Sequence, residues 1–412
     1  MSKKIHIAFA TTTPATANKM LRSIVKHLPS YDISAGALLI GQNEILHRKS
    51  FCITTEIIGE YYDYLPIVDS RNLCQGYLQK KLNLEGGIGL ILDDDLRWIM
   101  DESIFSMLVN QLKLVHCDMA FSSLAGDPPI PKEYTRASPL LDMLIAIRNS
   151  GHINKGINTF LNKVTITSDN EVNYKHHDIY TYKKSSFFPS DTDLSKIDWY
   201  EFFSNIVKGK TTTRPVITPT TISQATGRER GGSTIILNAE VLNNKNISLH
   251  SDKWVSRRSD MMMACAAYNT GFTLYLTPPI MKHVREESFD SHDVVKLIGD
   301  ILGVSLVESS YIGSDLSRDF ESILSNRINQ TSFILSETSE ILKLLYNYLD
   351  EESFLNKDIG DIINNIINEN QYVITKLHHI KITEIVKAHS RFNNEIIIPQ
   401  SYIVTDEQRK VQ

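Results

Sequence analysis

Residues 86–98 read Gly-Gly-Ile-Gly-Leu-Ile-Leu-Asp-Asp-Asp-Leu-Arg-Trp. The apolar run at 88–92 follows two glycines and is typical of a buried strand in a mostly parallel sheet. This run ends abruptly in three carboxylates, Asp93, Asp94 and Asp95. Ligands of open α/β sheets bind at the carboxyl ends of the strands, so the stretch predicts a binding site beside these acids.

Three adjacent carboxylates at the end of a buried strand repel one another unless a cation or hydrogen-bond donors offset their charge. On an extended backbone, Asp93 and Asp95 would point to one side and share a divalent cation. Asp94 would point away, toward the ribose or sugar of a bound nucleotide. Mn²⁺ or Mg²⁺ suits oxygen ligands and keeps positions open for substrate phosphates. The alternative is a solvated acidic turn that only ends the strand.

The segments around this stretch predict further elements of an α/β sheet. Residues 5–10 and 33–40 read as strands on either side of a helical pattern at 16–27. Such a strand, helix, strand order is typical of a right-handed parallel crossover. After the acids, a helical stretch at 102–114 leads to another strand at 119–123.

A second motif lies upstream of the acids, where Ser70-Arg71-Asn72 opens an amphipathic stretch that runs to about Leu82. A Ser-Arg-Asn at a helix start, followed by a strand ending in Asp-Asp-Asp, resembles the nucleotide-sugar-dependent glycosyltransferases of GT-A fold, especially their family-two inverting group. The resemblance covers residues 5–127 and 228–285 and implies an α/β fold with a Rossmann-like mixed sheet. It also implies that Asp93 and Asp95 hold the metal and the donor diphosphate, and that Arg71 lies near the donor nucleotide.

The same resemblance assigns further site residues. Thr11 and Thr12 follow the first strand, where these enzymes hold the nucleotide base, although hydroxyls also fill loops for local reasons. Asp260 precedes a helical run at the place of the catalytic base. The usual pair of acids is replaced here by Ser259 and Asp260. His283 follows a strand at the place of the histidine that completes the metal site.

Basic residues flank these positions on both sides. Arg257 and Arg258 would keep Asp260 ionised through their charge and could contact the donor phosphates. Lys282 and Arg285 could meet the leaving diphosphate. Asp260 also suits a plain helix N-cap, because its side chain can accept hydrogen bonds from first-turn amides.

Composition and charge narrow the class of protein. The chain has 412 residues, of which 42% are hydrophobic and 22% charged, as in an ordinary globular protein. A net charge of −5 argues against non-specific nucleic-acid binding, which needs a basic face. Its four cysteines form no Cys-x-x-Cys pair, which favours free thiols. We find neither a signal peptide nor an apolar run of roughly 20 residues, so we expect a cytoplasmic protein without a transmembrane segment.

We expect a catalytic domain over residues 1–290 and a helical C-terminal region over 291–412. Residues 150–228 are polar, carry scattered aromatic side chains, and predict an insertion that shapes the acceptor side. From residue 291 onward, 3.6-residue periodicity predicts helices. These helices could pack on the catalytic domain, form a homo-oligomer or dock a partner.

The leading hypothesis is a metal-dependent, inverting glycosyltransferase that moves a sugar from a nucleotide-sugar donor to an acceptor hydroxyl. Asp260 would deprotonate the acceptor, and the metal would neutralise the leaving nucleoside diphosphate. One alternative is a catalytically degenerate transferase fold that serves as a binding or assembly subunit. A sugar-phosphate nucleotidyltransferase is disfavoured, because residues 10–14 lack the glycine-rich loop of those enzymes.

Overall fold

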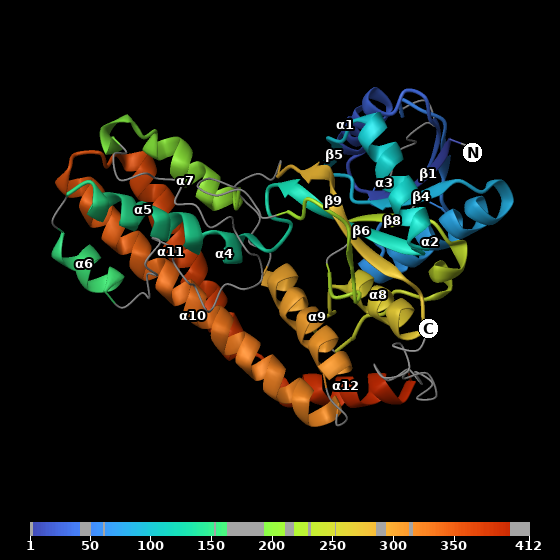
Figure 1. Cartoon of the computed structure of the whole chain (residues 1–412). Coiled ribbons are helices and arrows are strands. Elements are labelled where there is room, and N and C mark those ends of the chain that lie inside the picture. Colours follow the sequence, from blue (N-terminus) through green and yellow to red (C-terminus); the bar gives the residue numbers. More distant parts are fainter. Residues whose placement is uncertain are drawn as a thin grey trace.

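The computed structural model describes residues 3–41, 51–60, 62–151, 154–162, 193–210, 218–229, 232–251, 253–285, 294–312 and 316–395. Within these ranges the chain forms a sheet domain with a helical region beside it (Figure 1). Residues 163–192 and 211–217 of the expected insertion, and 396–412 of the expected C-terminal region, lie outside the described residues.

The N-terminal half of the sheet is parallel. β1 (Lys4–Thr11) lies between β2 (Asp32–Leu39) and β4 (Ile88–Leu92), and β2 also pairs with the short strand β3 (Thr55–Ile57). The helix α1 (Pro14–His27) connects β1 to β2. The strand, helix, strand order predicted from the sequence is therefore confirmed.

The other half of the sheet is mixed. β8 (Ser233–Ile236) runs antiparallel between β4 and β6 (Met119–Gly126), and β9 (Leu274–His283) pairs in parallel with β6. The short strands β5 (Leu96–Trp98) and β7 (Ser223–Gln224) run antiparallel to β9. The whole sheet has nine strands in the order β3-β2-β1-β4-β8-β6-β9-β5, with β7 paired to β9.

Helices cover both faces of the sheet. α1 and α3 (Glu102–Leu114) pack on one face, while α2 (Ile67–Glu85) and α8 (Ser259–Asn269) pack on the other. The buried positions of α1 recur at the spacing of one helical face. They are Ala17, Met20, Leu21 and Ile24.

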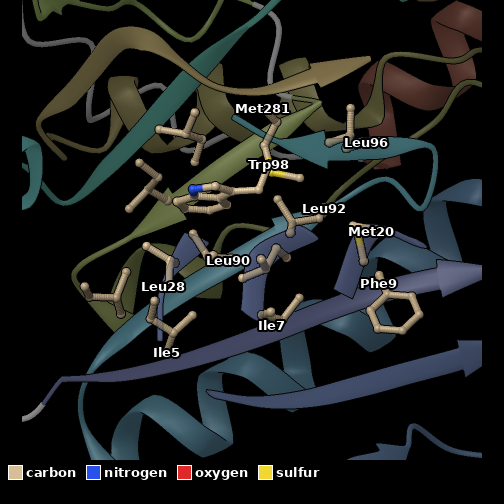
Figure 2. Close-up of a cluster of buried hydrophobic side chains, with 14 of the residues drawn as sticks. Ile5, Ile7, Phe9, Met20, Leu28, Leu90, Leu92, Leu96, Trp98 and Met281 are labelled. Carbon is tan, nitrogen blue, oxygen red and sulfur yellow. The ribbon is translucent and has the colours of Figure 1, made fainter. Parts of the chain in front are cut away.

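Alternation of side chains along β1 supplies the core beneath α1. Ile7 and Phe9 point to this face and are at most 1% exposed, and Figure 2 shows them in the same core as Met20 of α1. Trp98 of β5 lies in this core and donates from Nε1 to the carbonyl oxygen of Met100 at 2.6 Å. Packed side chains thus hold the strand ends in place at the edge where the three acids lie.

The helical region is built from two distant parts of the chain. Its first part follows β6 and contains α4 (Lys132–Thr135), α5 (Ala137–Asn149), α6 (Lys155–Leu161) and α7 (Trp199–Lys208). Its second part contains α10 (Leu316–Glu351) and α11 (Lys357–His378). Apolar side chains of α5, α6, α7, α10 and α11 form one core. The described helices of the expected insertion therefore pack with the C-terminal helices (Figure 1).

Two further helices connect this region to the sheet. α9 (Val294–Ile312) and α12 (Ile382–Glu395) share a core with α10 and with Met262 and Cys265 of α8. In the described part of the chain, no helix is both long and apolar enough to cross a membrane. The predicted fold class, a Rossmann-like mixed α/β sheet with a helical C-terminal extension, is confirmed.

Candidate active site

The candidate site lies at one edge of the sheet, where the predicted residues converge from distant elements. β1 ends at Thr11 and β4 ends at Leu92, which pairs with Ser233 at the start of antiparallel β8. At the same edge, Gly126 at the end of β6 pairs with His283 at the end of β9. Because these strand ends are adjacent, Asp93, Asp94 and Asp95 extend across the edge from β4 toward β9.

The backbone of Asp93, Asp94 and Asp95 forms a turn and is not extended as expected from the sequence. The amide of Leu96 donates to the carbonyl oxygen of Asp93 at 3.4 Å, and the chain then enters β5 beside β9. β8 and β6 lie between β4 and β9, so the turn spans the ends of two intervening strands. In this turn, Asp93 contacts Arg71 and Asp95 contacts His283.

Asp95 is paired with His283. Nε2 of His283 lies 2.9 Å from Oδ2 of Asp95, and Nδ1 of His283 lies 2.9 Å from the carbonyl oxygen of Asp127. Since a carbonyl can only accept, Nδ1 carries a proton and Nε2 is the nitrogen that faces Asp95. Burial opposes ionisation of Asp95, but the hydrogen bond and the charge of His283 outweigh it and lower the pKa of the carboxyl.

Asp95 and His283 are two of the three expected metal ligands, and they lie within hydrogen-bond distance of each other. Oδ1 of Asp95 is shielded from solvent and has no hydrogen-bond partner among the described residues. An orphaned carboxylate oxygen beside an oriented imidazole nitrogen is a donor set for Mn²⁺ or Mg²⁺. Within the described ranges, no group of three His, Cys, Asp or Glu side chains is arranged to hold a metal ion. Asp93 contacts Arg71 at 3.7 Å, and the metal assignment of Asp93, Asp95 and His283 stays a prediction.

Arg71 links the end of β4 to the start of α8. Its Nη1 lies 2.7 Å from Oδ2 of Asp260, and its Nη2 lies 3.7 Å from Oδ1 of Asp93. Burial alone would lower the pKa of the Arg71 guanidinium, but the charges of Asp260 and Asp93 raise it above its ordinary value. Arg71 therefore stays charged and holds Asp260 in position at the sheet edge.

The helix that carries Asp260 starts differently from the expectation. α8 begins at Ser259, and its N-cap residue is Arg258, which makes no side-chain capping hydrogen bond. Asp260 therefore lies in the first turn and is not the N-cap. Arg258 adopts a left-handed backbone conformation, with φ of 69°, and its guanidinium pairs with Asp300 of α9 at 2.5 Å.

Asp94 is held at the end of β1. Thr11 donates from Oγ1 to Oδ2 of Asp94 at 2.5 Å and accepts from the amide of Thr13. Burial is the main cause that raises the pKa of Asp94 to about 6. The negative charges of Asp95 and Asp93 also raise this pKa, whereas the hydrogen bond from Thr11 lowers it. Thr12 is exposed next to this pair. The nucleotide role expected for Thr11, Thr12 and Asp94 stays a prediction.

The basic residues expected at the site occupy different environments. Burial lowers the pKa of Arg257, and the positive charges of Arg258 and Arg71 lower it further. The negative charges of Asp300 and Asp93 partly offset this lowering. Arg257 therefore lies near both pairs of charges. Lys282 is exposed, and alternation along β9 points it to the face opposite His283. Arg285 is buried and donates to the carbonyl oxygens of Pro128 and Ile130. Its guanidinium therefore braces the loop after β6.

Sequence reasoning missed two residues that shape the site. The carbonyl of Asp127 orients His283, and the carboxylate of Asp127 accepts from the amide of Arg285 at 2.9 Å. Its position directly after a strand that ends at the same edge could have marked it. Asp300 lies inside α9 and pairs with Arg258 only in the folded chain, so no local pattern marks it.

A scan against protein-family models and a search of curated proteins found no match for this chain. Among solved structures, the chain is similar to S. aureus TarS 1–349 in complex with UDP-GlcNAc, at 10% identity and a TM-score of 0.33, over 95% of this chain and 92% of that one. A second TarS structure matches at 11% identity and a TM-score of 0.35, over 94% of this chain and 55% of that one. A Desulfovibrio desulfuricans G20 protein named as a nucleotide-diphospho-sugar transferase matches at 10% identity and a TM-score of 0.22, over 30% of this chain and 59% of that one. At this low similarity, the function proposed below rests on the residues of the site.

Proposed function

We propose that this protein is a glycosyltransferase that moves a sugar from a nucleotide-sugar donor to an acceptor hydroxyl, with inversion at the sugar. The observation that supports this proposal is the convergence of two charged pairs at one sheet edge. Asp95 pairs with His283, and Arg71 pairs with Asp260. The first pair offers ligands for a divalent cation, and the second offers a cation for phosphate beside a carboxylate that can take up a proton.

The donor would be held from both sides of this edge. Arg71 and Arg257 carry the charge needed to bind a diphosphate, and a guanidinium matches phosphate oxygens with two parallel hydrogen bonds. Thr11 and Asp94 at the end of β1 would contact the nucleoside. A Mn²⁺ or Mg²⁺ ion held by Asp95 and His283 would supply Lewis-acid neutralisation of the diphosphate charge.

Asp260 would act as the catalytic base. Its carboxylate takes the proton of the acceptor hydroxyl while the acceptor oxygen forms a bond to the anomeric carbon. The bond from that carbon to the diphosphate oxygen breaks, and the nucleoside diphosphate leaves with the electron pair. Diphosphate binding would compete with Asp260 for the Arg71 guanidinium, which makes Asp260 more basic once the donor is in place.

Donor turnover tests this function. Wild type is incubated with a panel of nucleotide sugars and Mn²⁺, and release of nucleoside diphosphate is measured beside Asp260→Asn, Asp95→Asn and the control Asp361→Asn. Asp361 is an exposed residue of α11, so its variant should keep wild-type turnover. Release from one donor, lost in the first two variants, supports the proposal.

The other outcomes separate the alternatives. Nucleotide binding without release would favour the degenerate binding subunit. Release of pyrophosphate from a nucleoside triphosphate and a sugar phosphate would favour the nucleotidyltransferase. Neither binding nor release of any nucleotide by the folded protein would overturn the proposal.

A further inference from the structure

The helix α9, which comes after the expected catalytic domain, lies directly against the loop that precedes α8. Gly299 and Gly303 face this loop and allow the close approach. A Cβ added to Gly299 would lie 2.8 Å from the carbonyl oxygen of Val255, and one added to Gly303 would collide with the carbonyl oxygen of Arg257. The amide of Arg257 also donates to the carbonyl oxygen of Gly299 at 2.8 Å. The loop and α9 are therefore joined backbone to backbone.

Asp300 lies between the two glycines and adds a charge contact. Its Oδ1 is 2.5 Å from Nη2 of Arg258, and the two side chains are 3% and 6% exposed. An ion pair with so little exposure has strong directional preference, because neither charge has water as an alternative partner. Asp300 therefore fixes where the Arg258 side chain goes.

The backbone of Arg258 determines how α8 begins. Its φ of 69° is a conformation that residues other than glycine rarely adopt. The next residue, Ser259, starts α8, and Asp260 follows in the first turn, where it meets Arg71 at 2.7 Å. If Arg258 relaxed to an ordinary backbone conformation, α8 would leave the loop in another direction and Asp260 would move relative to Arg71.

We propose that Asp300, packed through Gly299 and Gly303, is a positioning residue for Asp260. It holds Arg258 in the left-handed conformation that aims the first turn of α8 at the sheet edge. This inference rests on the proposed function in that Asp260 is the group whose position matters for turnover. The catalytic unit therefore includes α9, which lies beyond residue 290.

The variant Asp300→Asn keeps the shape of the side chain and removes its charge. We expect hydrogen exchange at amides 259–263 to rise and kcat to fall at least tenfold, because a small displacement of a catalytic group is costly. The donor KM should stay within about twofold, since Asp300 does not touch the donor in this proposal. Asp361→Asn, on the surface of α11, is the matched control and should leave exchange and kcat unchanged.

A second variant separates positioning from a general loss of packing. In Arg258→Gly/Asp300→Asn both charges are gone, and glycine adopts a positive φ without penalty. We expect this double variant to recover much of the kcat and exchange protection that Asp300→Asn alone loses. Gly303→Ala should lower kcat as Asp300→Asn does, whereas Gly360→Ala, whose Cβ would make only an ordinary contact at 3.6 Å, should not.

Two results would overturn the inference. One is wild-type exchange and kcat in Asp300→Asn, and the other is a double variant no better than Asp300→Asn. Hydrogen exchange keeps the test independent of catalysis. If the wild type turns over no donor, the proposed function fails, but exchange at 259–263 still decides whether Asp300 positions the start of α8.

Discussion

Replacing Arg71 by methionine would remove the cation that joins Asp93 and Asp260. The guanidinium lies 2.7 Å from Asp260 and 3.7 Å from Asp93, and its side chain is only 20% exposed. Methionine keeps the length of the side chain and its packing on α2 but leaves two carboxylates without this partner. Arg71→Lys is the matched variant, because it keeps the charge but lacks the planar fork that reaches both acids.

The expected effect on stability is moderate. Exposed ion pairs contribute about 0.2–1 kcal/mol, whereas breaking a fully buried pair costs about 3–5 kcal/mol. The Arg71 and Asp260 side chains are 20% and 17% exposed, so this pair lies between those limits. We expect Arg71→Met to lower the free energy of unfolding by about 2 kcal/mol. In a chain of 412 residues, such a loss lowers the melting temperature by a few degrees.

The expected effect on turnover is larger. In the proposed function, Arg71 holds the base and contributes charge to diphosphate binding, so its loss should lower kcat/KM about 100-fold, or about 2.7 kcal/mol of transition-state stabilisation. Nucleoside diphosphate release at several donor concentrations gives kcat/KM, and urea unfolding gives stability. Arg71→Lys should retain stability but lose most of the kcat/KM. Wild-type kcat/KM in a folded Arg71→Met protein would show that Arg71 contributes nothing to turnover.

The remaining predictions concern the metal, the pH dependence of stability and the helical region. His283→Gln should weaken Mn²⁺ binding at least tenfold, measured by calorimetry, and unchanged affinity would remove His283 from the site. Burial lowers the pKa of His389 to about 4 from an ordinary 6.5. Between pH 6.5 and pH 4, His389 is therefore protonated in the unfolded chain but neutral in the folded one. Stability should fall as pH drops from 6.5 to 4, by up to about 3 kcal/mol, and His389→Gln should flatten that slope in urea unfolding at each pH. Glu369→Gln leaves the buried Arg136 without its carboxylate partner at 2.8 Å and should lower the free energy of unfolding by about 3 kcal/mol. An unchanged free energy of unfolding would show that this ion pair contributes little.

The sequence predicted the strands of the sheet, and the edge at which the three acids lie, from local signals. The branched run of β4 and the apolar run of β1 are properties of single segments, and both are buried strands as expected. The position of Asp94 at the end of β1, where Thr11 meets it, follows from the parallel pairing of those two strands. Such inferences succeed because burial on both faces leaves a mark on each strand by itself.

The backbone at residues 93–95 is a turn and not the extended segment expected from the sequence, for a tertiary reason. The shared metal role of Asp93 and Asp95 stays a prediction. Alternation applies only while the chain stays extended, and here β8 and β6 are inserted between β4 and β9. Both strands follow later in the sequence, so residues 86–98 hold no sign that the acids must cross them. Within this turn, Asp93 contacts Arg71 and Asp95 contacts His283.

Which helices of the helical region pack against one another could not be predicted from local sequence patterns either. Apolar faces on α10 and α11 predict that each of these helices packs against another part of the protein. They do not specify that helices of the expected insertion pack on helices near the C-terminus. The pair Arg258 and Asp300 is of the same kind, because its two members come together only when α9 docks on the loop before α8.

In the proposed function, the sheet edge binds a nucleoside diphosphate together with a divalent cation through Asp95. Thermal unfolding with UDP, GDP, ADP, CDP and TDP, each with and without Mn²⁺, tests it on wild type, Asp95→Asn and Asp361→Asn. A ligand at 100 times its dissociation constant stabilises the folded state by about 2.7 kcal/mol. We predict a rise in melting temperature for one nucleotide that needs Mn²⁺, is lost in Asp95→Asn and is kept in Asp361→Asn. A folded wild type whose melting temperature is unchanged by every nucleotide and Mn²⁺ together would contradict this proposed binding.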